Sequence, residues 1–256
     1  MADRLLEIRS LSRSFGGLKA VNDVSFTVQA GSIKSVIGPN GAGKTTLFNL
    51  ISGMLPSDSG AVRKNGKEIT RLQPHRITAL GICRTFQTTK LFSRMTVLEN
   101  VMVGRHPRTK AGFLSGVLNL PWTWKEEREI RERSFELLDS LGLTDTAEDL
   151  ASNLPFGKQR RLEIARALAT EPSLLLLDEP AAGLNIYETR EMADLVLKIR
   201  KWGITVLLVE HDMSLVMDIS DEIVVLNYGS KVAEGRPEEI QRDPEVIRIY
   251  LGGGHA

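Results

Sequence analysis

Apolar and polar residues alternate along the start of the chain. The apolar positions are Leu5, Ile8, Leu11, Val24, Phe26 and Val28. Because successive residues of a strand point to opposite faces, this alternation predicts half-buried antiparallel strands. Gly16-Gly17 predicts the turn between two of them, and residues 57–60 predict a further turn. Asn65-Gly66 favours a tight hairpin.

The pattern becomes helical in the middle of the chain. Residues 125–141 are highly charged, and their apolar residues recur at helical spacing. Further helices are predicted over residues 158–169 and 188–201. Two short helices, over residues 237–241 and 244–251, are expected to end the chain.

Two apolar runs in the second half of the chain predict strands buried on both faces. Residues 174–177 are four leucines, and residues 204–209 form the second run. Strands with both faces covered belong to parallel sheets that helices flank. Residues 223–226 and 231–233 then predict a terminal hairpin. The whole order is a β-rich start, an α/β unit, a helical middle and an α/β return, which predicts an α/β fold.

One octet brings in chemistry. Residues 38–45 read Gly-Pro-Asn-Gly-Ala-Gly-Lys-Thr and fill every fixed position of the phosphate-binding loop G-x-x-x-x-G-K-[ST]. The octet lies between an apolar stretch and a helix start, as the motif requires. Glycines have no Cβ, so backbone N–H groups can turn toward phosphate oxygens. Lys44 is expected to reach the β- and γ-phosphates, and the Thr45 hydroxyl to ligate Mg²⁺. An ordinary glycine-rich turn before a helix is the simpler interpretation, but it leaves the complete motif unexplained.

Acidic residues follow the first buried strand. A phosphate-binding loop needs an acid at the end of a neighbouring buried strand, and Asp178-Glu179 comes directly after the four leucines. Asp178 is expected to act toward the metal, and Glu179 as the base that orients the attacking water. Taken alone, Asp-Glu-Pro is as consistent with a solvated turn at the end of a strand as with these two roles. Beside a complete phosphate loop, the metal and base roles are favoured.

His211 follows the second buried strand. Parallel strands share their carboxyl edge, so His211 is expected to reach the γ-phosphate. A lone histidine at a strand end is more often structural, and this alternative stays open on spacing alone. Gln87, in Arg84-Thr85-Phe86-Gln87, is by default a surface glutamine.

Composition excludes several classes of function. The 33 basic and 32 acidic residues leave a formal net charge of +1, which gives no general argument for nucleic-acid binding. The single cysteine, Cys83, excludes an internal disulfide. No apolar run approaches the roughly 20 residues of a membrane span, and the N-terminus lacks a signal-peptide pattern. We therefore expect a soluble, cytoplasmic chain unless a partner holds it at a membrane.

These motifs together resemble the nucleotide-binding subunit of an ABC transporter. The resemblance covers essentially the whole chain as one cassette. It implies a P-loop NTPase (RecA-like) core over residues 1–87 and 166–233, whose N-terminal part is an antiparallel β subdomain. It also implies an inserted α-helical subdomain over residues 88–165 and a short helical tail over residues 234–256.

The resemblance also assigns roles to individual positions. Catalytic roles are implied for Glu179, His211, Lys44 and Gln87, and metal contacts for Thr45, Gln87 and Asp178. The implied nucleotide-binding positions are Phe15, Gly38, Pro39, Asn40, Gly41, Ala42, Gly43, Lys44, Thr45, Thr46, Leu154, Pro155, Phe156, Gly157 and Lys158. Among these, Phe15 would stack on adenine. The implied cofactors are ATP and Mg²⁺.

The signature motif departs from the family pattern. The family usually has Leu-Ser-Gly-Gly-Gln, whereas this chain has Leu154-Pro155-Phe156-Gly157-Lys158. In the family, a serine hydroxyl and a glycine N–H meet the γ-phosphate of a nucleotide held by the opposite subunit. Proline has neither a hydroxyl nor a backbone N–H. We expect a weakened signature whose remaining donors are Gly157 and the helix N-terminus. Asn185 also stands where the family usually has aspartate.

Finer likeness indicates a subfamily. Residues 85–92, 95–101 and 209–217 are similar to the ATPases of branched-chain (hydrophobic) amino-acid importers. That resemblance implies a second homologous ATPase or a homodimer, two membrane permeases and, indirectly, an extracytoplasmic solute-binding protein, with no nucleic acid. It places the chain peripherally on the cytoplasmic face of the cell membrane. The alternatives are an ATPase of lipopolysaccharide export, an ATPase for another solute, and a soluble regulatory ABC protein.

Overall fold

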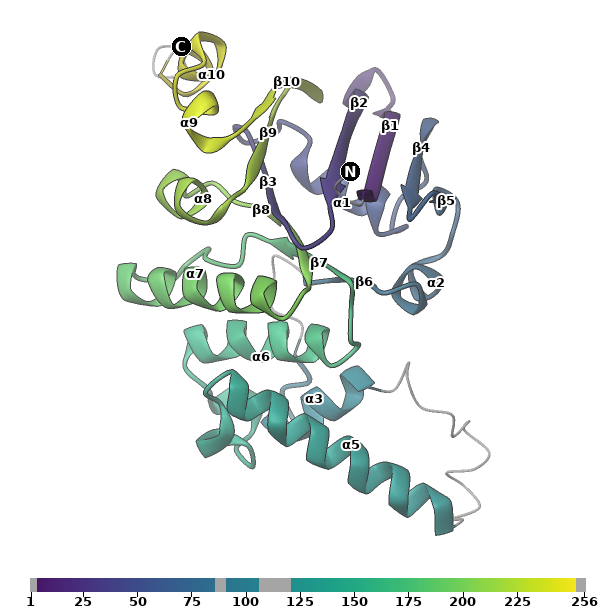
Figure 1. Cartoon of the computed structure of the whole chain (residues 1–256), viewed down its shortest axis with the longest axis vertical. Helices are drawn as coiled ribbons and strands as arrows, with labels where there is room; N and C mark the ends of the chain where they lie inside the picture. Colours follow the sequence, from purple (N-terminus) through teal and green to yellow (C-terminus); the bar gives the residue numbers. More distant parts are fainter. Residues whose placement is uncertain (1–3, 86–90, 106–120, 252–256) are drawn as a thin grey trace. The chain divides into compact units, whose positions relative to one another are not determined.

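The structure is a computed structural model that describes residues 4–85, 91–105 and 121–251 (Figure 1). It divides into two compact units. Unit 1 comprises Met1–Arg84 with Ser173–Ala256, and unit 2 comprises Thr85–Pro172. Unit 2 contains the helical subdomain predicted over residues 88–165 and extends a few residues further at each end. The functional subdivision itself stays a prediction.

The first sheet of unit 1 is antiparallel, as the alternation predicted. Its strand order is β2-β1-β4-β5. The strands are β1 (Arg4–Phe15), β2 (Leu18–Gln29), β4 (Ser59–Lys64) and β5 (Lys67–Glu68). Gly16-Gly17 joins the first pair, and Asn65-Gly66 joins β4 to β5. Asn65 and Gly66 both have positive φ, 48° and 77°, which is the conformation that a tight two-residue hairpin requires.

The prediction of a turn over residues 57–60 is wrong for its last two residues, because Ser59 and Gly60 already belong to β4. Gly60 has φ 84°, and a Cβ there would lie 2.3 Å from the Ser10 carbonyl oxygen. The pairing of β1 with β4 shifts register between Arg9 and Ser12. The glycine therefore serves a close backbone approach at a bulge and not a chain reversal.

The second sheet of unit 1 carries the predicted buried strands. Its order is β10-β9-β3-β8-β7-β6, and all neighbours are parallel except β9 and β10. The strands are β3 (Ile33–Ile37), β6 (Ile82–Arg84), β7 (Leu174–Asp178), β8 (Thr205–Val209), β9 (Glu222–Asn227) and β10 (Ser230–Gly235). Every residue of β3, β7 and β8 is buried, which confirms the double-sided burial. The terminal hairpin β9–β10 is likewise confirmed.

Helices cover the second sheet on two sides. They are α1 (Lys44–Ile51), α2 (Pro74–Ala79), α7 (Ile186–Lys201), α8 (Met213–Ile219), α9 (Pro237–Ile240) and α10 (Pro244–Leu251). One core holds α1 together with side chains of both sheets, among them Leu6, Ile8, Leu47, Ile51, Leu176 and Leu207. A second core includes side chains of α8, α9 and α10, and Ile37, Val216 and Ile223 are among its fully buried residues.

A buried lysine ties the two sheets together. Lys34 of β3 lies 2.5 Å from a carboxylate oxygen of Glu234 and 2.9 Å from one of Glu222, and it donates to the Thr27 carbonyl at 2.6 Å. Burial raises the pKa of Glu234, but hydrogen bonds from Lys231 and Lys34 outweigh that effect, so its pKa lies below the ordinary value. The charged groups compensate one another, as a desolvated ammonium requires.

Unit 2 is helical. Its main elements are α3 (Val97–Arg105), α5 (Pro121–Ser140) and α6 (Phe156–Leu168). The fully buried Asn100 of α3 accepts from the Phe92 N–H at 2.9 Å and donates to the Thr96 carbonyl at 2.9 Å, so it holds the loop before α3.

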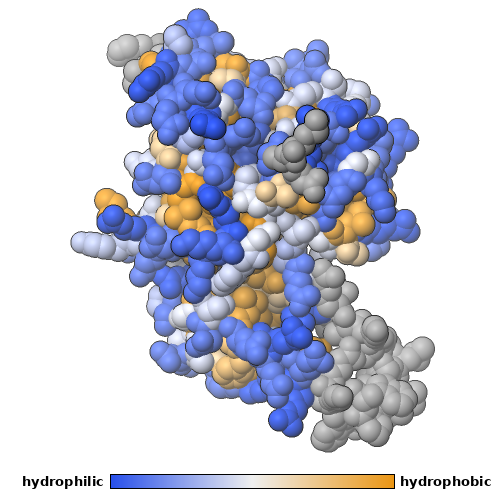
Figure 2. All heavy atoms as spheres, in the orientation of Figure 1, coloured by the Kyte–Doolittle hydropathy of each residue, from blue (hydrophilic) through white to orange (hydrophobic). Residues whose placement is uncertain are grey.

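Of the helices that the structure describes, none has the length and apolar character to cross a membrane. Hydrophilic residues cover most of the face seen in Figure 2.

Candidate functional site

Three neighbouring strands of unit 1 bring the predicted nucleotide residues to one edge of the sheet. Val36 of β3 is in register with Val209 of β8, which is in register with Asp178 of β7. The phosphate loop follows β3, Glu179 follows β7, and His211 follows β8 at the next residue but one. Because the strands are parallel, all three connections leave at the same carboxyl edge, where open α/β sheets bind their ligands.

The loop over residues 38–43 fits tightly against its neighbours. A Cβ on Gly38 would lie 2.2 Å from the Leu226 carbonyl oxygen, and a Cβ on Gly43 would lie 2.2 Å from that of Ala20. The loop also holds the tip of the β9–β10 hairpin, because the Gly229 N–H donates to the Ala42 carbonyl at 3.0 Å. Glycine is therefore required here for packing, as well as for the backbone freedom expected from the motif.

Lys44 begins α1 and is buried. Its ammonium group donates to the carbonyl oxygens of Gly38 at 2.6 Å and Pro39 at 3.1 Å, so the side chain folds back along the loop. Burial lowers the pKa of Lys44, and the carboxylates of Glu179 and Asp178 act in the opposite direction. The cation thus lies in the field of both predicted acids.

Asp178 is the last residue of β7 and is buried. One of its carboxylate oxygens lies 2.7 Å from the guanidinium of Arg84, at the end of β6. Arg84 also donates to Asn49 of α1 at 2.7 Å and to Ser52, the residue that caps the end of α1, at 3.1 Å. The arginine thus joins the predicted metal acid to the helix behind the phosphate loop. Sequence reasoning missed this role, because a single arginine in a three-residue strand gives no periodic signal.

Glu179 has an unusual backbone for a residue with a side chain. Its φ is 49°, in the left-handed region, directly after β7. Its N–H donates to the Val209 carbonyl at 2.9 Å, and its carbonyl accepts from the Ala182 N–H at 3.1 Å. The turn therefore leaves the strand sharply at the predicted base. Strained backbone of this kind is frequent at functional sites.

His211 lies on the connection from β8 to α8, and its side chain is 61% exposed. Its Nδ1 is 3.7 Å from a carboxylate oxygen of the preceding residue, Glu210. Asp212 on the other side caps α8 by accepting from the Ser214 N–H at 2.9 Å. The imidazole is therefore held on an anchored backbone and remains accessible from solvent.

Glu210 is fully buried, and sequence reasoning missed it. It accepts backbone hydrogen bonds from Ala181 at 2.8 Å and from His211 at 3.0 Å. Burial raises the pKa of Glu210, and these hydrogen bonds offset part of that rise. The available signal was a glutamate directly after a fully apolar strand, but sequence alone gave no reason to expect it inside the protein.

Phe15 and Gln87 are two further predicted contacts, and only Phe15 lies within the described residues. Phe15 ends β1 and is 44% exposed, with the Arg13 guanidinium 5.1 Å from the centre of its ring. Its ring is accessible enough for stacking on a base. Gln87 lies outside the residues that the structure describes, so its predicted role stays a prediction.

The signature residues lie in unit 2, at the start of α6. Pro155 is the residue before the helix, and Phe156 is its first residue, 45% exposed with the Arg160 guanidinium 5.1 Å from its ring. The helix thus begins two residues earlier than predicted. Leu154 is buried, and its carbonyl accepts from the Gln159 side chain at 2.9 Å. Phe156, Gly157 and Lys158 supply the first N–H groups of the helix, which are the donors available to an anion there.

Asn185 has a clear structural role. It caps α7 by accepting from the N–H groups of Tyr187 at 2.9 Å and Glu188 at 3.1 Å, and Glu188 accepts in return from the Asn185 N–H at 3.0 Å. This reciprocal arrangement is a capping box. Asparagine caps a helix as well as aspartate does, so the departure from the family pattern leaves the helix start intact.

The oxygen donors of the edge suit Mg²⁺ when a nucleotide shares the coordination. Thr45 offers an exposed hydroxyl and Asp178 a carboxylate, and Mg²⁺ prefers such oxygen ligands together with phosphates and water. Within the described part of the chain, no three histidine, cysteine, aspartate or glutamate side chains cluster closely enough to hold a metal by themselves. The oxygen donors of Thr45 and Asp178 therefore suit a metal that is coordinated together with phosphate.

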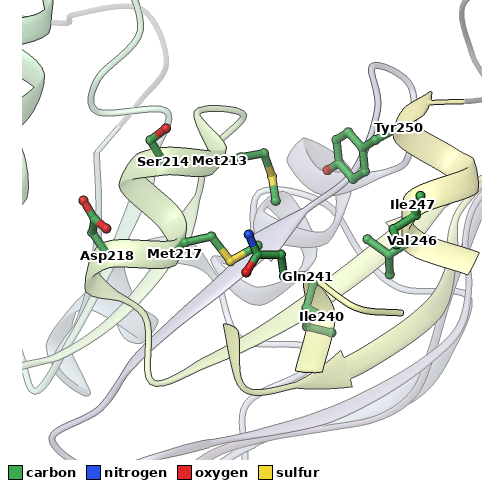
Figure 3. Close-up of a pocket in the computed structure, with 9 residues that line it drawn as sticks. All are labelled: Met213, Ser214, Met217, Asp218, Ile240, Gln241, Val246, Ile247 and Tyr250. Atoms are coloured by element: carbon green, nitrogen blue, oxygen red, sulfur yellow. The ribbon is translucent and has the colours of Figure 1, made fainter. Parts of the chain in front are cut away.

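A cavity of about 430 Å³ lies elsewhere in unit 1, between α8 and the C-terminal helices. Figure 3 shows Met213 and Met217 of α8 facing Val246 and Tyr250 of α10 across it. None of the predicted nucleotide-binding residues lines this cavity. Burial raises the pKa of Tyr250 to about 12, against a lowering effect from a hydrogen bond with the Gly38 backbone.

Comparison with known proteins agrees with this geometry. The ABC transporter family matches residues 21–182, and a family described as branched-chain amino acid ATP-binding cassette transporter matches residues 230–256. The chain is 47% identical to the high-affinity branched-chain amino acid transport ATP-binding protein BraF of Pseudomonas aeruginosa, over 98% of this chain and 99% of that protein. It is 46% identical to LivG of Escherichia coli, a protein of the same description, over the same shares.

Solved structures give the same fold. A crystal structure of an ATP-binding cassette of an ABC transporter, in its ADP conformation, superposes with a TM-score of 0.85. It is 36% identical and covers 97% of this chain and 99% of that one. The P-loop NTPase fold predicted from the motifs is confirmed. The chain belongs to the ABC transporter family, as a nucleotide-binding cassette with ATPase activity.

Proposed function

We propose that this chain is the ATPase subunit of an importer of branched-chain amino acids. The observation that carries this proposal is the likeness to BraF and LivG over nearly the whole chain, including the separate family match at residues 230–256. No described residue needs to contact the solute for this function. The chain would couple ATP turnover to transport through partner subunits.

The edge of the sheet supports a division of roles. The backbone N–H groups of residues 38–45, which Pro39 lacks, and the Lys44 ammonium hold the phosphates of ATP, and Phe15 stacks on its adenine. Glu179 accepts a proton from the water that attacks the γ-phosphorus, while the bond to the bridging oxygen breaks and ADP leaves. His211 donates a hydrogen bond to the γ-phosphate. Gln87 is proposed to sense the metal and the membrane subunit.

Thr45 and Asp178 are proposed to hold Mg²⁺ together with the phosphates. When bound, the ion neutralises negative charge on the transferred group. Arg84, at 2.7 Å from the Asp178 carboxylate, keeps that side chain oriented from behind. This arrangement agrees with a metal that enters with the nucleotide.

A complete site needs a second cassette. The start of α6 would approach the γ-phosphate of a nucleotide held by the opposite subunit, using the N–H groups of Phe156, Gly157 and Lys158. Pro155 offers neither a hydroxyl nor an N–H group. A homologous second ATPase with a complete signature would therefore make more hydrogen bonds to the nucleotide bound by this chain. This chain, in turn, would make fewer to the nucleotide bound by its partner.

The proposed assembly contains this chain, a homologous ATPase, two membrane permeases and, on the other side of the membrane, a solute-binding protein. The chain would act on the cytoplasmic face. The alternatives are an ATPase of lipopolysaccharide export, an ATPase for another solute, and a soluble regulatory ABC protein. The family match at residues 230–256 favours the amino-acid importer over these.

The test is transport by the reconstituted assembly. Proteoliposomes holding the two ATPases and the permeases receive binding protein loaded with leucine, isoleucine or valine, or with glutamate as the control solute. We expect uptake of the branched-chain solutes and a matching rise in ATP hydrolysis. Uptake of another solute alone would overturn the solute proposal while leaving the ATPase intact.

The catalytic roles have their own test in the same vesicles. Glu179→Gln should lower ATP hydrolysis by at least about 10²-fold, because the base is lost, while ATP binding stays near that of the wild type. Near-normal turnover of this variant would contradict the assignment of Glu179 as the base.

A further inference from the structure

Glu210 is a buried carboxylate that joins two loops of the nucleotide site. Its side chain has no exposed surface. One oxygen accepts from the Ala181 N–H at 2.8 Å, and the other accepts from the His211 N–H at 3.0 Å. The second oxygen also lies 3.5 Å from the Asp212 nitrogen, at the outer limit of a hydrogen bond. The two oxygens thus face different connections of the sheet.

The first connection carries the proposed base. Ala181 lies two residues after Glu179, in the turn that follows β7. The Glu179 N–H donates to the Val209 carbonyl at 2.9 Å, one residue before Glu210. The turn after β7 is therefore attached to the end of β8 twice, through Glu179 and through Ala181. The acceptors of these two hydrogen bonds are Val209, the last residue of β8, and Glu210, the residue after it.

The second connection carries the proposed γ-phosphate contact. His211 has a largely exposed side chain, so its position depends on its backbone. That backbone is held by Glu210 on one side and by the Asp212 cap of α8 on the other. One carboxylate therefore links the turn that bears Glu179 to the backbone of the residue that bears the imidazole.

A carboxylate is a costly choice for a buried position, because it must leave water. It has one property that other side chains of this size lack. It accepts hydrogen bonds at both oxygens and presents no donor, whereas glutamine offers one accepting oxygen and one donating NH₂ group. Backbone N–H groups approach Glu210 from both loops, so glutamine would place its NH₂ group against one of them.

We propose that Glu210 is a positioning residue for ATP hydrolysis, which holds Glu179 and His211 at a fixed separation by accepting backbone hydrogen bonds from both loops. The proposal rests on the roles of Glu179 and His211 given above. Glu210 itself touches neither the nucleotide nor the metal in this scheme. Its loss should therefore act on the chemical step and not on nucleotide binding.

The experiment measures kcat and KM for ATP in the assembled transporter, with ATP affinity of the full chain measured separately by fluorescent nucleotide binding. Glu210→Ala should lower kcat by on the order of tenfold to a hundredfold, as misplacement of catalytic groups does. KM and ATP affinity should stay within about twofold, because the contacts of Lys44 and the phosphate loop are untouched. Glu210→Gln should lie between alanine and wild type, because it keeps one acceptor.

Glu234→Gln is the matched control. It also removes a partly buried carboxylate of unit 1, one that pairs with Lys34 and lies outside the nucleotide residues. It should lower the unfolding midpoint in urea but leave kcat unchanged. If Glu210→Ala fails to fold, the kcat of Glu210→Gln still shows whether Glu210 contributes to the chemical step.

Two results would overturn the proposal. One is a kcat within about twofold of wild type for the foldable Glu210 variants. The other is a kcat that falls only in proportion to the folded fraction, as measured by circular dichroism. Wild type and Glu179→Gln run in the same assay, so a failure of the proposed base would show as activity in Glu179→Gln, independently of Glu210.

Discussion

At the scale of single residues, Glu179 combines the proposed chemistry with a strained backbone. Its φ of 49° lies where residues other than glycine rarely stay, at a cost of about 1 to 3 kcal/mol. Glycine removes that strain and also removes the carboxylate. We expect Glu179→Gly to be more stable than Glu179→Gln by about 1 kcal/mol in urea unfolding, with both variants inactive in ATP hydrolysis.

A second residue with the same backbone serves as the control. Glu171 has φ 50° and lies outside the nucleotide residues. Its ion pair with Arg105, at 3.2 Å, is lost in both Glu171→Gly and Glu171→Gln, so it does not affect their comparison. Glu171→Gly should gain stability over Glu171→Gln by a similar amount, with ATP hydrolysis retained. A less stable Glu179→Gly than Glu179→Gln would mean that the left-handed backbone at Glu179 carries no strain.

The sequence allowed some site residues to be predicted and hid others, for a physical reason. The phosphate loop and Asp178-Glu179 follow apolar strands at fixed spacings, because each role depends on a short piece of chain. Arg84 and Glu210 act through partners far along the chain, at Asp178 and Ala181. Pairings of that kind depend on strand order, which no local pattern encodes.

At the scale of elements, α7 follows the proposed catalytic turn directly, so its first residues matter for that turn. Asn185 closes a capping box with Glu188. Asn185→Ala removes the side-chain acceptor and should cost about 1 kcal/mol of unfolding free energy. Asn185→Asp keeps the acceptor and adds negative charge at the helix N-terminus, so it should match or exceed the wild type in stability.

Denaturant unfolding of the two variants checks the role of this cap. Helix α7 is also held by the buried side chains Met192, Leu195, Val196 and Ile199, so neither substitution should unfold it. Equal stability of Asn185→Ala and wild type would show that the cap contributes nothing measurable.

Elements with a clear local pattern could be predicted, whereas β6 and α2 could not. The helix predicted over residues 125–141 corresponds to α5, and the leucine run is β7. By contrast, β6 has three residues and α2 six, which is too few for a period to show. Their positions depend on packing, since β6 pairs with β7 from across the chain. Gly60 likewise resembled a turn signal but lies in a bulged strand.

At the scale of the whole molecule, two glutamates of unit 1, the fully buried Glu210 and the partly buried Glu234, give opposite contributions to stability as pH changes. Burial raises the pKa of Glu210 above its ordinary 4.5, despite the backbone hydrogen bonds that it accepts. For Glu234, burial also raises the pKa, but Lys231 and Lys34 more than reverse this, and the net pKa lies below 4.5. One folded chain thus contains a carboxyl group that binds its proton more tightly than in the unfolded chain and one that binds it less tightly.

The sign of each effect follows from linkage between protonation and folding. The raised pKa of Glu210 favours folding at pH 4.5 and below, and this contribution is lost as pH rises through the folded-state pKa. The lowered pKa of Glu234 favours folding above pH 4.5, and that contribution is lost as pH falls through its folded-state pKa. Glutamine removes the titration in either case. The difference in stability between wild type and each variant therefore reports the titration of one carboxyl group.

Urea titrations of wild type, Glu210→Gln and Glu234→Gln, from about pH 3.5 to about pH 8, measure both effects. The unfolding free energy of wild type minus that of Glu210→Gln should decrease as pH rises above 4.5 and then level off. The corresponding difference for Glu234→Gln should be level above pH 4.5 and decrease below it. Differences that change in the same direction would contradict the opposite environments of the two carboxylates. A level difference for Glu210 alone would mean that its backbone hydrogen bonds fully compensate its burial.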